Sequence, residues 1–263
     1  MEVIRAENLS KTYRIHEKPE GFRSSIKDFF HRKYVYKEAV AGLSFSMREG
    51  EVIGLLGENG AGKTTTLKML SGILYPSGGS VYVMGEEPWK RNREFLKKIA
   101  FVMGNKSDMN WDLPAVDTFA YQKLLYDIPE QEYRESLKRL TEMLRLDTIL
   151  LNTQVRRLSL GERMKVELVN SFLYSPRLIF LDEPTIGLDI GSQDAIREFI
   201  REYWQKKGAS ILLTSHDMDD IENTCDRILV LKKGKLAYAL DVEELKKKSG
   251  SFRETMKGLL EGE

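Results

Sequence analysis

The chain has 263 residues, 41% of them hydrophobic, which is enough for one large domain with a substantial core. Its 41 Lys and Arg side chains nearly cancel its 40 Asp and Glu side chains and leave a formal net charge of +1. This balance excludes a global electrostatic pull toward nucleic acid or an anionic bilayer, so no nucleic-acid partner is expected. The single cysteine, Cys225, excludes an internal disulfide and fits a reducing compartment.

The first segment is charged where a signal peptide would be apolar, and no stretch approaches the roughly 18 apolar residues of a spanning helix. Apolar residues set among charges over positions 3–9 predict an edge strand that ends in residues 10–13. The next segment, about residues 16–37, is basic and aromatic, is interrupted by Pro19 and Gly21, and carries apolar side chains at helical spacing. We interpret it as an atypical insertion that packs as a surface helix, contacts a partner protein or lies on a membrane.

A continuously apolar run over residues 52–56 predicts a strand that is covered on both faces, and it leads directly into a glycine-rich segment. That segment fits the P-loop, in which glycines let backbone N–H groups point at a phosphate and the following helix contributes its positive dipole end. We expect Lys63 to reach the β- and γ-phosphates and the Thr64 hydroxyl to bind Mg²⁺. The candidate nucleotide-binding residues are Gly57, Glu58, Asn59, Gly60, Ala61, Gly62, Lys63, Thr64 and Thr65.

Beyond the P-loop, the pattern predicts a helix over residues 65–74, a strand over 80–84 and a helical middle over about 117–151. From residue 161 onward, predicted helices and strands alternate, as is typical of a parallel α/β sheet with crossover helices. The helical middle interrupts that sheet. Residues after about 241 predict a charged helical tail.

A second buried strand is predicted over residues 178–181, and it ends in two adjacent carboxylates, Asp182 and Glu183. Ligands of open α/β sheets bind at the carboxyl ends of the strands, which is where these side chains would lie. We expect Asp182 to bind Mg²⁺, directly or through water, and Glu183 to act on the attacking water as a general base or orienting group. The alternative is a solvated turn, which the upstream P-loop disfavours.

Residues Leu158–Glu162, which read Leu-Ser-Leu-Gly-Glu, precede an amphipathic helix and resemble the hallmark Leu-Ser-Gly-Gly-Gln of the ATP-binding cassette (ABC) family. Thr185–Asp189 is similar to the family's loop after the acidic motif, and Thr214–Asp217 is similar to the segment that carries its switch histidine. These motifs follow the family's order over about residues 1–234. The residues within these motifs are similar to those of a bacterial exporter branch of the ABC family.

The resemblance implies a P-loop NTPase with a mixed or parallel sheet core, an antiparallel β subdomain and an inserted helical subdomain. The implied ATPase domain spans residues 1–240, with the helical subdomain at about 108–175, and the tail spans 241–263. It further implies that two cassettes stack head to tail with ATP between them. Ser159, Leu160 and Gly161 of one subunit would then face the P-loop of the other.

The resemblance also implies roles for single residues. His216 would hydrogen-bond the γ-phosphate and help Glu183 hold the attacking water, and Asp189 would join the nucleotide contacts. Tyr13 would stack on adenine, with Tyr34 or Tyr36 as alternatives.

The sequence departs from the family's pattern at three positions. Leu160 replaces a glycine, and Glu162 replaces a glutamine. The nearest equivalent of the family's Mg²⁺-linked glutamine is Asn105, whose side chain is one methylene shorter.

The function implied is that of the ATP-binding and hydrolysing subunit of an exporter-type ABC transporter on the cytoplasmic side of the cell membrane. It would act with a second ATPase subunit, identical or different, and with an integral membrane permease that docks near residues 105–113. Met109 and Trp111 are expected to be exposed there. Two alternatives stay open: a soluble ABC ATPase that remodels ribosomes or DNA, and a weakly hydrolysing nucleotide switch.

Overall fold

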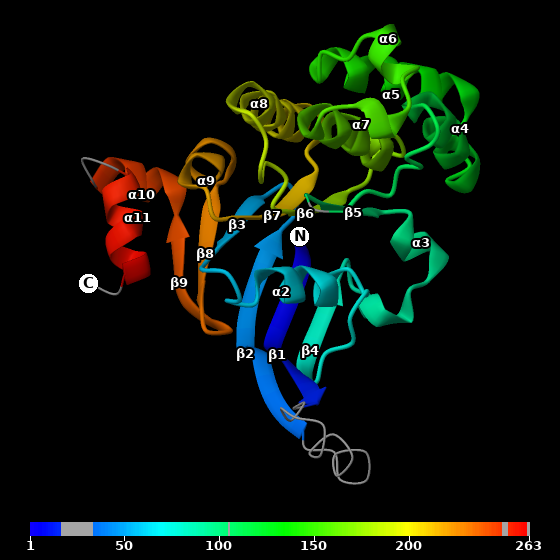
Figure 1. Cartoon of the computed structure of the whole chain (residues 1–263). Helices are drawn as coiled ribbons and strands as arrows, with labels where there is room; N and C mark the ends of the chain where they lie inside the picture. Colours follow the sequence, from blue (N-terminus) through cyan, green and yellow to red (C-terminus); the bar gives the residue numbers. More distant parts are fainter. Residues whose placement is uncertain (17–33, 105, 249–251, 262–263) are drawn as a thin grey trace, which may run out of the picture.

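Six strands form the central sheet of the computed structural model, which describes residues 1–16, 34–104, 106–248 and 252–261 (Figure 1). Their order across the sheet is β5-β6-β7-β3-β8-β9, and only the pairing of β8 with β9 is antiparallel. The strands are β3 (Val52–Leu56), β5 (Ile99–Met103), β6 (Leu178–Asp182), β7 (Ser210–Ser215), β8 (Arg227–Lys232) and β9 (Lys235–Asp241). All residues of β3, β6 and β7 are buried, which explains the apolar runs that make up most of each strand.

A second, antiparallel sheet has the order β2-β1-β4, with β1 at Glu2–His16, β2 at Tyr34–Arg48 and β4 at Gly78–Val83. Strand β1 is longer than the sequence predicts, because its pairing with β2 continues to the pair His16 and Tyr34. The outer parts of the predicted insertion are therefore strand. Residues 17–33, which carry its predicted helical spacing, lie outside the described residues.

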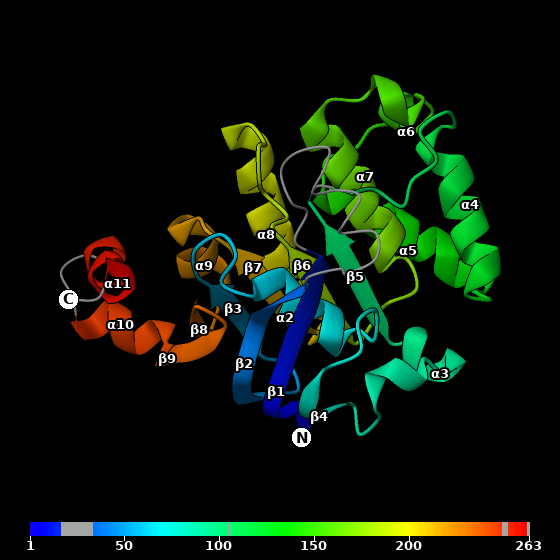
Figure 2. The ribbon, with the colours of Figure 1, turned by 60° about the horizontal axis from the view of Figure 1, so that its bottom comes forward.

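Helix α2 (Lys63–Leu70) packs between the two sheets and contacts β2 and β4 on one side and β6 and β7 on the other (Figures 1 and 2). Its residues Leu67, Met69 and Leu70 are fully buried in the core that the two sheets share. The helix that follows the P-loop is thus held on both faces. The predicted mixed sheet with an antiparallel β part is confirmed.

The helical middle is made of α4 (Ala115–Leu125), α5 (Glu130–Met143) and α6 (Thr148–Leu151). One face of α5 and the turn after it packs on the main core: Leu140 and Leu144 are fully buried, and Leu137 and Met143 lie partly buried against the same core. Helix α7 (Leu160–Phe172) contacts β5, α4, α5 and α8 (Ile190–Lys207). It joins the helical region to the sheet (Figure 2).

Several short elements were not predicted from the sequence, because each has too few residues to show a period. They are α3 (Arg93–Leu96) and the 3₁₀ turns η1 (Pro88–Lys90) and η2 (Val155–Arg157). Strand β9 was also missed, although its residues alternate between exposed and half-buried along its whole length. Helix α9 spans Met218–Thr224.

The predicted tail is helical, as α10 (Val242–Lys248) and α11 (Phe252–Glu261), but it is not only a charged extension. Phe252 and Met256 are buried in the main core, and the Arg253 guanidinium binds the Asp219 carboxylate of α9. The tail is therefore packed onto α9 (Figure 1). None of the helices in the described ranges combines the length and apolarity that crossing a membrane requires.

Candidate functional site

The P-loop leaves the carboxyl end of β3 and runs into α2, whose first residues are Lys63 and Thr64. Gly62, just before the helix, has a left-handed φ of 103°, and a Cβ there would lie 2.5 Å from the Ala39 carbonyl oxygen. Only glycine permits this approach between the loop and β2. The antiparallel sheet therefore covers one side of the candidate phosphate cradle.

Lys63 is the buried cation of this site, with 6% of its surface exposed. Its Nζ donates to the Gly57 carbonyl oxygen at 2.7 Å and lies 3.3 Å from Glu183 Oε1. A buried ammonium needs such partners to offset its loss of hydration. Phosphate oxygens placed in the cradle would be stronger partners than a neutral carbonyl.

Oxygen atoms that fit Mg²⁺ converge beside the cradle. Thr64 Oγ1 donates to Asp182 Oδ1 at 2.9 Å, and Thr214 Oγ1 donates to the same oxygen at 2.7 Å. A hydroxyl and a carboxylate suit a hard cation that keeps several waters and takes further ligands from a phosphate. No group of three or more acidic, histidine or cysteine side chains that could hold a metal ion occurs among the described residues. Asn105, the third predicted ligand, lies outside the described residues.

Glu183 lies between a cation and a histidine. Its Oε2 is 2.5 Å from His216 Nδ1, while its Oε1 faces Lys63. Glu183 adopts a left-handed φ of 54°, and its N–H donates to the Thr214 carbonyl at 3.1 Å and the Thr214 hydroxyl at 3.0 Å. The structure thus brings together Lys63, Glu183 and His216, which the sequence placed far apart.

The turn at Glu183 depends on a close approach by the loop after β5. A Cβ on Gly104 would lie 2.1 Å from the Glu183 carbonyl oxygen and 3.0 Å from Ile186 Cγ2. No larger residue fits without displacing that backbone. Sequence reasoning missed this role of Gly104, because the contact joins segments far apart in the chain.

The candidate nucleotide pocket contains one of the three tyrosines considered for adenine. Tyr13 lines it together with the P-loop, while the Tyr34 ring is covered by the Arg14 guanidinium at 3.5 Å, and Tyr36 is 69% exposed. Pocket-lining residues that the sequence did not single out are Ile15, Lys37, Ala39 and Ile186. Ile15, Lys37 and Ala39 carry no sequence signal for this role, because it is the long β1–β2 pair that places them at the pocket.

The segment Ser159–Gly161 begins helix α7. Ser159 is its N-cap, and with Glu162 it forms a capping box: Ser159 Oγ accepts from Glu162 N at 3.3 Å, and Glu162 Oε2 accepts from Ser159 N at 2.8 Å. Among the described residues that line the P-loop pocket, none belongs to this segment. Asp189 caps the neighbouring helix α8, where Ser192 N and Oγ donate to it at 3.0 and 2.7 Å, and these bonds lower the pKa of Asp189.

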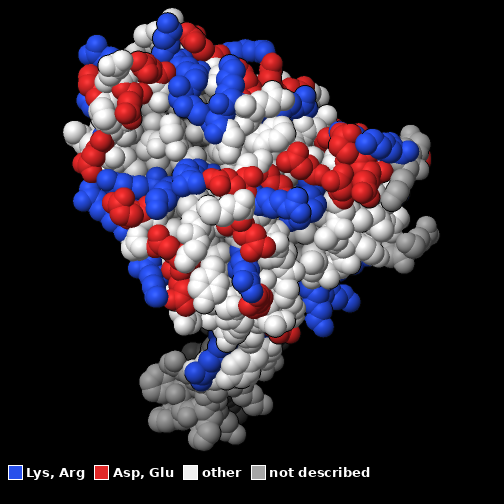
Figure 3. Space-filling view, turned by 180° about the vertical axis from the view of Figure 1, so that it is seen from behind, with Lys and Arg blue, Asp and Glu red and all other residues white. Residues whose placement is uncertain are grey.

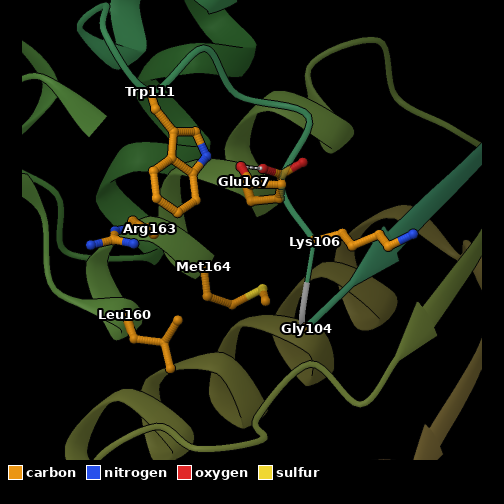
Figure 4. Close-up of a pocket in the computed structure, with 8 residues that line it drawn as sticks. Gly104, Lys106, Trp111, Leu160, Arg163, Met164 and Glu167 are labelled. Atoms are coloured by element: carbon orange, nitrogen blue, oxygen red, sulfur yellow. Dashed lines mark hydrogen bonds between the residues drawn. The ribbon is translucent and has the colours of Figure 1, made fainter. Parts of the chain in front are cut away.

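Leu160 instead lines a separate pocket with Trp111, Met164 and Glu167 (Figure 4). The Arg163 guanidinium lies over the Trp111 ring at 4.8 Å, and Trp111 is half-exposed, as expected. The expectation that Met109 is exposed is wrong: it is 4% exposed and belongs to the main core.

Glu167 is a buried carboxylate that the sequence did not reveal, because it lies inside an amphipathic helix. It is 4% exposed and accepts from Ser107 Oγ at 2.5 Å and Asp108 N at 3.2 Å. Burial raises the pKa of Glu167 above its usual value, against the opposing effect of these hydrogen bonds. The carboxylate therefore ties the loop after β5 to the helix that begins at Leu160.

A strand, a P-loop and a helix beside an acidic strand end define a P-loop nucleoside triphosphatase. Comparison with known proteins narrows this class: residues 40–186 match the family model described as ABC transporter. The chain is 33% identical over 217 residues to the ABC transporter ATP-binding protein NatA of Bacillus subtilis, covering 82% of this chain and 87% of that protein. The chain therefore belongs to the ABC transporter ATP-binding family and is an ATPase.

Other similarities agree with this assignment. The chain is 33% identical to the Nod factor export ATP-binding protein I of Burkholderia orbicola, covering 78% of this chain and 66% of that protein. Its fold matches a solved ATP-binding subunit of an ABC transporter with a TM-score of 0.78, at 24% identity and over 98% of this chain and 99% of that one. A dimeric post-hydrolysis state of the cassette MJ0796, bound to ADP and Pi, matches with a TM-score of 0.74 at 21% identity, over 91% and 98%.

Replacing Gly104 by alanine should slow ATP hydrolysis without abolishing ATP binding. The added Cβ would push on the Glu183 carbonyl and move its carboxylate, and a shift of about 1 Å costs on the order of 100-fold in rate. We expect kcat to fall about 10- to 100-fold in a steady-state ATPase assay. Gly258→Ala, where a Cβ meets nothing within 4 Å, is the matched control. Equal kcat values for the two variants would contradict the prediction.

Replacing Glu167 by glutamine should change how stability depends on pH. The folded-state pKa of Glu167 is raised, so its contribution is fully present below the unfolded pKa and is lost as pH rises through the folded pKa. The melting temperature of the unmodified chain relative to Glu167→Gln should therefore be higher at about pH 5 than at about pH 8. Glu198→Gln, which alters an exposed carboxylate, is the control. If the difference in melting temperature between the unmodified chain and Glu167→Gln does not depend on pH, the raised folded-state pKa of Glu167 is wrong.

Proposed function

We propose that this chain is the ATP-hydrolysing subunit of an exporter-type ABC transporter, peripheral on the cytoplasmic side of the membrane. It would pair head to tail with a second ATPase subunit and drive a separate membrane permease. The observation that carries the proposal is the Glu183 carboxylate held between Lys63 and His216 beside the P-loop. The export direction is supported by two similar proteins named for Nod factor export.

In the proposed reaction, a water oxygen attacks the γ-phosphorus, and the bond from phosphorus to the β–γ bridging oxygen breaks. Glu183 accepts a proton from the water, so ATP and water give ADP and inorganic phosphate. His216 Nδ1 holds the Glu183 carboxylate in place, and its other ring nitrogen would face the γ-phosphate. Lys63 Nζ would exchange the Gly57 carbonyl for phosphate oxygens and offset their charge.

Thr64 and Asp182 would hold Mg²⁺ beside the phosphates, since their oxygens already meet at 2.9 Å. When bound, the ion would neutralise charge on the β- and γ-oxygens. Tyr13 would stack on the adenine ring, since it is the candidate tyrosine that lines the pocket. The P-loop residues Gly57 to Thr65 would surround the phosphates.

The second ATPase subunit is proposed because Ser159–Gly161 lines no part of the P-loop pocket of its own chain. The segment nevertheless has two features of a phosphate contact: an exposed serine and the N-terminus of the 13-residue helix α7. In a head-to-tail pair it would complete the site of the other subunit. Asp189, which caps the adjacent helix α8, would lie at the same subunit contact.

Permease docking is proposed at a groove between α4 and β5, beside the segment predicted for it. Asp108 lines this groove with Ile73, Phe101, Tyr121 and Leu125. Tyr121 and Leu125 are 63% and 51% exposed, which is unusual for large apolar side chains that lie together. In our proposal the helical subdomain, about residues 108–175 of an ATPase domain over 1–240, is the part that faces the permease.

The exposed apolar side chains support a protein segment as the occupant of the groove, since a permease segment with apolar side chains of its own would cover them. The tail after residue 241 packs on α9, away from this groove (Figure 1).

The two alternative functions have less support. A nucleic-acid remodelling ATPase would need a basic face, whereas the face in Figure 3 carries Lys and Arg interspersed with Asp and Glu. A weakly hydrolysing switch would not need a carboxylate held between a lysine and a histidine. Both alternatives remain outcomes of the experiments below.

Replacing Glu183 by glutamine should trap the ATP-bound pair. The amide keeps the shape of the side chain but cannot accept the proton, so kcat should fall about 100- to 10,000-fold. ATP binding should persist, and size-exclusion chromatography with ATP should show a dimer that the unmodified chain forms only transiently. Unchanged turnover would falsify the role of Glu183. A slow variant that stays monomeric with ATP would count against the head-to-tail pair.

Replacing Leu125 by aspartate should release the permease from the ATPase. A charge in the groove would lose the apolar contact, while the distant P-loop pocket would be unaffected. The tagged chain is purified from detergent-solubilised membranes, and bound proteins are identified by mass spectrometry. Ile149→Asp, at an 81% exposed apolar residue of α6, is the matched control.

We expect the control, but not Leu125→Asp, to retain a protein with several spanning segments that alters the ATPase rate on reconstitution. Equal retention by both variants would place the docking surface elsewhere. Ribosomal proteins or nucleic acid in place of a membrane protein would favour the remodelling alternative.

A further inference from the structure

Asp220, on helix α9, has a buried carboxylate with an unusual set of partners. It is 3% exposed, and its Oδ2 accepts hydrogen bonds from Thr185 Oγ1 at 2.5 Å and from Ser215 Oγ at 2.6 Å. Its Oδ1 accepts from Arg197 Nε of α8 at 2.7 Å. One carboxylate therefore joins three segments of the chain, and each of its bonds is charge-assisted and shielded from water.

The two hydroxyls that Asp220 holds belong to the segments that carry the candidate catalytic pair. Thr185 follows Glu183 by two residues, and Ser215 immediately precedes His216. Both hydroxyl residues are buried, at 4% and 1% exposure. The Asp220 carboxylate therefore fixes the distance between two backbone segments, the one that follows Glu183 and the one that precedes His216.

Arg197 stabilises the same arrangement from the other side. Besides Asp220, its guanidinium donates to Asp217 Oδ2 at 2.9 Å, and Asp217 N in turn donates to Ser215 Oγ at 2.9 Å. The residues on both sides of His216 are thus held by one connected network. A paired arginine also offsets the cost of burying the Asp220 charge.

We propose that Asp220 is a positioning residue that sets the contact between the Glu183 carboxylate and the His216 ring. This inference rests on the proposed roles of those two residues. His216 is half-exposed, so little packing orients its ring, and its 2.5 Å contact with Glu183 depends on where the backbone places it. Asp220 supplies that placement through Ser215 on one side and Thr185 on the other.

The network is separate from the groups that would bind the nucleotide. Asp220, Thr185 and Ser215 are absent from the described residues that line the P-loop pocket. Loosening the network should therefore slow the chemical step and leave ATP affinity unchanged. Replacing a residue that only supported the fold would not lower the rate of the chemical step while leaving ATP affinity unchanged.

The test compares Asp220→Asn with Asp194→Asn, which removes a different and 66% exposed carboxylate from the same Arg197. An amide at position 220 cannot accept from Arg197 and from both hydroxyls together. We expect kcat to fall about 10- to 100-fold in Asp220→Asn, with ATP affinity changed less than about two-fold, and to be unaffected in Asp194→Asn. Parallel loss of affinity and kcat, or unchanged kcat, would overturn the proposal.

Two further variants keep the Asp220–Arg197 ion pair and so protect the test against a folding defect. Thr185→Val and Ser215→Ala each remove one hydroxyl, and each should lower kcat by a smaller factor at constant ATP affinity. In a Glu183→Gln background, Asp220→Asn should add no further loss, because the carboxylate that it positions is gone. Full additivity in that background would overturn the proposal, whereas normal turnover of Glu183→Gln alone would instead overturn the role of Glu183.

Discussion

The register of four parallel strands is the constraint on which the site depends. Asp182 on β6 stands opposite Thr214 on β7, Thr214 stands opposite Leu55 on β3, and Met103 on β5 stands opposite Asp182. This row places the P-loop, the acidic motif and the histidine segment at one edge of the sheet. Because side chains alternate along a strand, a slip of one residue would turn Asp182 away and break its bond with Thr214.

The left-handed turn at Glu183 directs its carboxylate to the same side as that of Asp182. Adjacent residues of a regular strand point to opposite faces, yet Asp182 contacts Thr64 and Glu183 contacts Lys63, and both partners lie in the first turn of α2. A left-handed φ at a residue other than glycine costs on the order of 1–3 kcal/mol. The hydrogen bonds that the Glu183 N–H donates to the Thr214 carbonyl and hydroxyl, together with the close fit of Gly104, hold that conformation. Strain at this position is thus balanced by contacts that also aim the carboxylate.

The sequence predicted the sheet core, the P-loop strand and helix, the acidic strand end and the helix after residues 158–162, because each is encoded in a short stretch of sequence. It could not separate Tyr13 from Tyr34 and Tyr36, since that choice depends on how β1 and β2 pair and on the Arg14 contact. It misjudged Met109, whose burial is decided by distant helices. It did not reveal Asp220 or Glu167, because Thr185 and Ser107, with which they pair, lie 35 and 60 positions away in the chain.

The two departures from the family's hallmark segment, Leu160 and Glu162, differ in the physical effect that we expect from them. Glu162 brings a negative charge, but its carboxylate accepts the Ser159 N–H, so the charge is directed back to the helix cap. Glutamine could make the same bond, and the capping geometry therefore tolerates either residue. Leu160 is 46% exposed beside a pocket that Trp111 and Met164 also line, so its bulk extends over the surface that a second subunit would meet. Any difference in closure of the pair should therefore arise from the shape of Leu160 rather than from the charge of Glu162.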